Sequence, residues 1–160
     1  MRRIAFLTWS LLFAAFVAAT VARADESEVR NAALRTVEAG LVLDADFEFE
    51  LTPRLAEVLA NGVPLYFVVE FELGRRRWYW LDEKVASKKL EMRVSYHPLS
   101  RQYRLATGPL QQNFASLQDV LNVMKHVRSW LVVDRTESFA DADYEAAVRL
   151  HLDTGLLPKP

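Results

Sequence analysis

The chain has 160 residues, of which 51% are hydrophobic and 26% charged, so it is long enough for one domain with a substantial core and is not generally disordered. Its formal net charge of -1 gives no indication of a nucleic-acid partner. Cysteine is absent, which excludes disulfides, thiolate metal sites and cysteine nucleophiles.

The N-terminus has the pattern of a secretory signal peptide. The basic start Met1–Arg3 precedes a largely apolar run from Ile4, and Ala22 and Ala24 are the small residues that a signal peptidase reads. We therefore expect cleavage after Ala24, a periplasmic location, and a single domain over residues 25–160. The alternative is an uncleaved membrane anchor, because the apolar run approaches the length that spans a bilayer. Only in that case do we expect membrane contact.

The first two elements after the signal are predicted to be strands. Residues 28–38 alternate poorly between apolar and polar side chains, and a turn follows at residues 38–40. In residues 41–51 the odd positions are apolar, which indicates a strand with one buried face. The even positions form an acidic ladder: Asp44, Asp46, Glu48 and Glu50. Same-face residues stand about 6.6 Å apart, so we expect the ladder to be solvated or paired with arginines across strands rather than to hold a cation.

A short helix and a hairpin are predicted next. Thr52 and Pro53 are typical of a helix N-terminus, and Asn61-Gly62 of its end. Residues 65–73 alternate as a strand, Gly74 with the following arginines can turn the chain, and residues 77–85 are predicted to return. The apolar face of the first strand is Leu65, Phe67, Val69, Phe71 and Leu73.

The turn of this hairpin combines arginine with tryptophan. Alternation places Trp78 and Trp80 on one face, and exposed tryptophan beside arginine is typical of binding surfaces. The alternative is that this face is covered, with arginine stems lying over the rings. The predicted binding residues, including two from a turn expected to lie nearby, are Arg75, Arg76, Arg77, Trp78, Trp80, His97 and Arg101.

The remaining elements complete a mainly β, antiparallel sandwich. Residues 89–97 and 101–106 are predicted as strands, as are residues 130–133 and 144–152. Ser116 is predicted to cap a helix with the apolar stripe Leu117, Val120, Leu121, Met124 and Val127. In total, the sequence predicts about seven to eight strands and two short helices, and no βαβ unit repeats along the chain. We therefore expect a β-rich α+β fold of the β-sandwich type.

No pattern in the chain indicates a reaction. His97 precedes a turn proline, His126 is predicted within the second helix, and His151 on the outer face of the last strand, without metal-ligand spacing. There is no nucleophile elbow and no glycine-rich phosphate loop. We predict no catalytic residue, no metal site and no cofactor.

Four segments together resemble a known family. These are the stretch from Leu51 to Ala86, "VSYHPLSRQYRL", "QNFASLQDVLNVMKHVRSW" and the closing "RLHLDTGLLPKP". They are similar to the proteobacterial domain-of-unknown-function family 4390, some members of which are named only as proline-rich signal-peptide proteins. The resemblance implies export and a gene setting near a nitrogen-regulation-like sensor kinase, but no catalytic residue. Family members continue past Leu-Pro-Lys-Pro, so truncation after Pro160 is an alternative to a complete chain.

Two functions are compatible with these observations. The first is a non-enzymatic periplasmic module that binds another envelope protein, such as the periplasmic domain of a sensor kinase. The second is an envelope binder or hydrolase of small molecules or glycans, with Trp78 and Trp80 as a stacking platform and Glu70, Glu72 or Asp82 as polar partners. The second function requires a concave pocket with converging polar groups.

Overall fold

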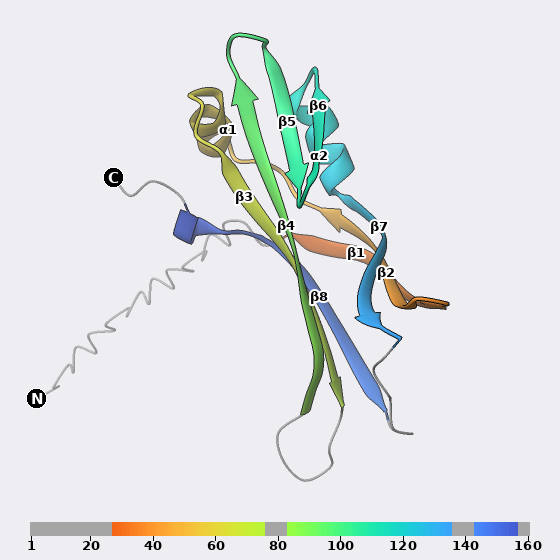
Figure 1. Ribbon diagram of the computed structural model, residues 1–160. Coiled ribbons are helices and arrows are strands. Elements are labelled where there is room, and N and C mark those ends of the chain that lie inside the picture. Colours follow the sequence, from red (N-terminus) through yellow and green to blue (C-terminus); the bar gives the residue numbers. More distant parts are fainter. Residues whose placement is uncertain (1–26, 76–82, 136–142, 157–160) are drawn as a thin grey trace, which may run out of the picture.

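The computed structural model describes residues 27–75, 83–135 and 143–156, which form two antiparallel sheets and two helices (Figure 1). The smaller sheet has the order β1-β2-β7, and the larger one the order β6-β5-β4-β3-β8. The predicted antiparallel β-sandwich with two short helices is confirmed. In chain order the elements are β1 (Glu28–Val37), β2 (Gly40–Glu48), α1 (Pro53–Ala60), β3 (Leu65–Arg75), β4 (Glu83–His97), β5 (Gln102–Thr107), β6 (Leu110–Phe114), α2 (Leu117–Met124), β7 (His126–Asp134), β8 (Tyr144–Leu152) and the short 3₁₀ helix η1 (Thr154–Leu156).

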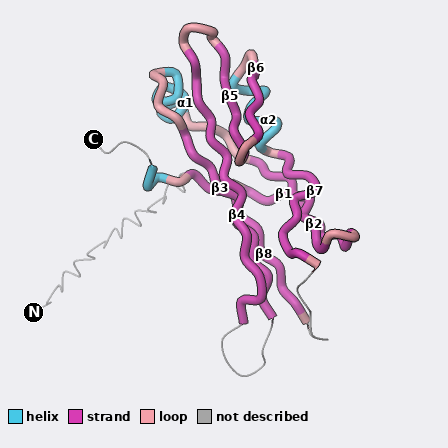
Figure 2. Tube along the Cα trace, in the orientation of Figure 1, coloured by secondary structure: helices cyan, strands magenta, loops and turns pink. Residues whose placement is uncertain are grey.

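Both helices begin where their sequences predict. The Thr52 hydroxyl accepts a hydrogen bond from the backbone N–H of Leu55 at 3.4 Å, and the Ser116 hydroxyl accepts one from Asp119 at 3.1 Å. Each hydroxyl satisfies a donor that the first helical turn would leave unpaired. Figure 2 shows the two helices near one end of the sandwich, where β4 turns into β5.

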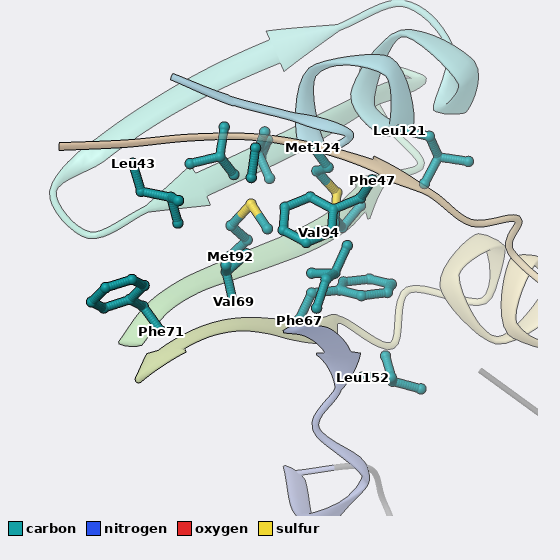
Figure 3. Close-up of a cluster of buried hydrophobic side chains, with 14 of the residues drawn as sticks. Leu43, Phe47, Phe67, Val69, Phe71, Met92, Val94, Leu121, Met124 and Leu152 are labelled. Carbon is teal, nitrogen blue, oxygen red and sulfur yellow. The ribbon is translucent and has the colours of Figure 1, made fainter. Parts of the chain in front are cut away.

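The core lies between the sheets and is closed at this end by α2. The alternating residues of β3 from Leu65 to Leu73 face inward, as predicted, and Phe71 is completely buried. Leu43 and Phe47 of β2 meet them from the smaller sheet, and Leu121 and Met124 enter from α2 (Figure 3). The apolar faces of β2, β3 and β4 are thus buried between the layers.

Two predicted element boundaries are wrong. Residues 77–85 and 89–97 were expected as separate strands, but β4 runs unbroken from Glu83 to His97, because Ser87 and Lys88 pair with β3. The second helix was expected to reach Val127, but α2 ends at Met124. Val127 instead lies in β7, where it pairs with Ala45 of β2 and is buried in the core. Pairing with a distant strand therefore decides its structure, although its spacing continues that of the helix.

Sheet B, the five-stranded sheet, is wider than the three-stranded sheet A that covers it. Contacts between the layers join β7 to β4 and β1 to β8. The described strands of sheet A therefore cover β4, β3 and β8, whereas β5 and β6 are contacted by α2. Because of this difference in width, no described strand of sheet A covers the inner face of β5 and β6.

Candidate functional site

The structure describes three residues of the predicted binding surface, Arg75, His97 and Arg101, and does not bring Arg75 together with the other two. Arg76, Arg77, Trp78 and Trp80 lie outside the described residues. Arg75 ends β3 and pairs with Glu83, at the start of β4. His97 is the last residue of β4, and Arg101 lies in the following turn with a positive φ of 51°. Because β4 has 15 residues, this turn is about 45 Å from Arg75, at 3.3 Å per residue. His97 and Arg101 are therefore not neighbours of Arg75.

The carboxylates considered for glycan chemistry are held in ion pairs. Glu70 lies on the outer face of sheet B, where Lys89 Nζ and Arg149 Nε each approach one of its oxygens at 2.6 Å. Hydrogen bonds from Lys89 and then Arg149 lower the pKa of Glu70 from 4.5 to about 2. A carboxylate held in its ionised form by two cations is a poor general acid at neutral pH.

Glu72 lies two residues after Glu70 in β3, on the same outer face of sheet B. Lys84 Nζ lies 2.5 Å from Glu72 Oε1, while Asp82 lies outside the described residues. The hollow between Glu70, Glu72 and Arg149 has a volume of about 220 Å³, below the usual range for ligand pockets. These residues form a cross-strand ladder on the surface of the sheet.

Three members of the acidic ladder, Asp44, Asp46 and Glu48, lie in β2 and are paired with cations, as expected. Asp44 accepts a hydrogen bond from Arg35 at 2.7 Å, and Glu48 accepts one from Lys125 at 2.7 Å. Asp46 contacts Arg128 and, at 2.7 Å, Nδ1 of His126. Among residues 27–75, 83–135 and 143–156, no group of acids and histidines is arranged to hold a metal ion.

The contacts of Asp46 correct the predicted position of His126. This histidine was expected in the second helix, but it is the first residue of β7 and pairs with Asp46 across the sheet. Hydrogen bonds from His126 and then Arg128 lower the pKa of Asp46. The histidine is thus part of an ion-pair network on the outer face of sheet A.

A bulge in β7 contains Arg128, a member of this network. Leu43 pairs with Trp130 and Ala45 with Val127, so two residues of β7, Arg128 and Ser129, stand opposite Asp44 alone. Ser129 has a positive φ of 49°, and its backbone N–H donates to Asp44 Oδ1 at 2.7 Å. The carboxylate of Asp44 thereby fixes the bulge.

An apolar groove lies next to β7, over the uncovered end of β5 and β6. It has a volume of about 470 Å³. Its floor comes from β4, β5 and β6, its end from α2 and one wall from β7. We call it the edge groove and define it by six lining residues: Leu105, Thr107, Leu110, Val123, Trp130 and Leu131.

The side chains of the edge groove belong to the inner face of sheet B. Leu110 pairs with Thr107, and Gln112 with Leu105, which is 4% exposed. Residues paired in an antiparallel sheet share a face, so Leu110 also faces inward. Leu110 is nevertheless 58% exposed, and Val123 at the end of α2 is 43% exposed. They are exposed because no described strand of sheet A lies over them.

Sequence reasoning missed this site. Residues 107–115 were assigned to no element, and β6 is the strand that forms the groove floor. The signal was nevertheless present, because Gly108-Pro109 is a turn signal directly after a predicted strand and Leu110, Gln112 and Phe114 are spaced by two. The polar residues between them weakened the pattern.

Comparisons with known proteins identify a family whose function is unknown. In the part of the chain that the structure describes, no helix is long and apolar enough to cross a membrane. No curated protein and no solved structure matches the chain. The family model described as "Domain of unknown function (DUF4390)" matches residues 24–160, so the chain belongs to this family.

Proposed function

We propose that the protein is an exported, non-enzymatic binding module of the bacterial cell envelope, and that it binds another envelope protein in the edge groove. The observation that carries the proposal is the exposure of inward-facing apolar residues on one side of the sandwich. Leu110 is 58% exposed, whereas Leu105, on the same face of the neighbouring strand β5, is 4% exposed. Apolar side chains of this kind are stabilised when a partner removes them from water.

The export half of the proposal is supported by the N-terminal sequence. The basic start, the apolar run and the small residues Ala22 and Ala24 are together typical of a cleaved signal peptide. The periplasmic domain of a sensor kinase is the first partner to test, because the family resemblance implies a gene setting near such a kinase.

Site-specific photo-crosslinking in cells tests the proposal. The photoreactive p-benzoylphenylalanine would replace Leu110 in the groove or, as a control, Leu99, which is fully exposed in the turn between β4 and β5. We expect a discrete adduct with another envelope protein from position 110 and none from position 99. Equal labelling from both positions, or no adduct at position 110, would contradict the proposal.

A further inference from the structure

We propose that the edge groove takes an extended segment of the partner as one more strand of sheet A, paired with the edge of β7 that no described strand occupies. This inference rests on the proposed function and specifies how the groove is occupied. The partner segment is a short, uncharged strand with apolar side chains at alternate positions. Three features of the structure lead to this occupant.

The first feature is the position beside β7. Sheet A has the order β1-β2-β7, and among the described residues β7 pairs with β2 alone. Since β7 lies over β4, the next strand position in sheet A lies over β5, where the edge groove is found. An added strand would extend sheet A over β5 and bring the two layers closer to equal width.

The second feature is the combination of a backbone edge with an apolar floor. The outer edge of a terminal strand carries N–H and C=O groups that only another hydrogen-bonding backbone can pair regularly. Every second side chain of that strand would point down toward Leu105 and Leu110. A lipid chain or a small apolar ligand could fill the same volume but would leave the edge of β7 unpaired. The bulge at Arg128 and Ser129 interrupts the edge, so we expect the paired segment to be short.

The third feature is the state of the polar side chains Arg128 and His126, which also line the groove. Arg128 is engaged by the Asp46 carboxylate and donates to the carbonyl oxygens of Ala45 at 3.0 Å and Val127 at 2.9 Å. His126 contacts the same carboxylate. Because the Arg128 charge is already paired with Asp46, the groove offers a charged partner little additional attraction. An uncharged segment fits this environment best.

A second copy of this chain does not fit the same position. If β7 paired with its own copy around a two-fold axis perpendicular to the sheet, both larger sheets would lie on the same side. The strands β5 and β6 of each copy, which extend beyond β7, would then overlap with β4 and β3 of the other. A single strand from another protein avoids this overlap.

The experiment uses a displayed library of random dodecapeptides selected against the purified protein. We expect the enriched peptides to carry apolar residues at alternate positions and to lack proline. One enriched peptide is then synthesised in two N-methylated forms, each blocking the backbone N–H groups along one edge. We expect one form to bind about ten-fold more weakly, because it loses its hydrogen bonds to β7, and the other to bind like the parent peptide.

Matched protein variants locate the binding site. Leu110→Lys should abolish binding of the selected peptide, and Leu99→Lys, the same change at another exposed leucine, should leave it unchanged. Circular dichroism confirms that both variants fold. If Leu110→Lys abolishes binding but both N-methylated forms bind normally, the groove binds its partner without strand addition and only this inference fails. If no peptide is enriched, or if Leu110→Lys has no effect, strand addition in the groove is also refuted. The proposed function is decided separately, by the photo-crosslinking.

Discussion

Replacing Glu70 with glutamine should make the protein less stable at neutral pH and less sensitive to acid. Glu70 is 11% exposed, and its partners Lys89 and Arg149 are 61% and 72% exposed. A fall in pKa from 4.5 to about 2 would correspond to roughly 3 kcal/mol at 1.36 kcal/mol per pH unit. Water screens the exposed cations, so we expect Glu70→Gln to lower the free energy of unfolding by about 1 kcal/mol at pH 7.

The pH dependence follows from the direction of this shift. A carboxyl group whose pKa is lower in the folded protein stabilises the fold above its unfolded pKa, and this contribution disappears as the pH falls. The stability difference between wild type and Glu70→Gln should therefore be complete at pH 7, begin to shrink near pH 4.5 and vanish near pH 2. Urea unfolding at several pH values measures it, with Glu91→Gln, an exposed residue of β4, as the control. A difference that stays constant from pH 7 to pH 2 would refute the ion-pair reasoning.

Three further predictions follow from the core, a helix cap and the N-terminus. Phe71→Ala should lower the free energy of unfolding by about 3–5 kcal/mol, because Phe71 is completely buried, and a loss below about 1 kcal/mol in urea unfolding would contradict its place in the core. Ser116→Ala should lower the free energy of unfolding by about 1 kcal/mol, because α2 loses its N-terminal cap. Ser100→Ala, in the turn after β4, should leave the midpoint of thermal unfolding unchanged. The N-terminal sequence of the protein isolated from cells should begin at Asp25, and a protein that begins at Met1 would contradict cleavage.

Local patterns in the sequence predict the elements whose residues repeat with a clear period. The alternation of β3 identifies its buried face, and Thr52 and Ser116 identify both helix starts, because a strand face and a helix cap depend on residues a few positions apart. Boundaries set by distant partners are not visible in this way. Val127 continues the helical spacing of α2, yet its partner Ala45 in β2 makes it part of a strand.

The paired charges show a second limit of sequence reasoning. Alternation places Asp44 and Asp46 on one face, and pairing with cations across the sheet was a general expectation. The particular partners of Asp46, His126 and Arg128, depend on the register of β2 against β7 and on the bulge in β7. A bulge in one strand changes which residues face each other, and its position is not encoded in the spacing of apolar residues.

The edge groove depends on a property that no single segment contains, namely the difference in width between two sheets. Leu99 and Leu110 both follow a proline, and the sequence distinguishes them only by the weak strand pattern that begins at Leu110. The structure distinguishes them, because Leu99 lies in the turn itself, whereas Leu110 begins β6 and faces the side of sheet B that sheet A leaves open. The exposure of Leu99 needs no partner to explain it, but an inward-facing leucine beside a free strand edge is suited to one. The comparison of these two positions is therefore the most direct test of function that the fold provides.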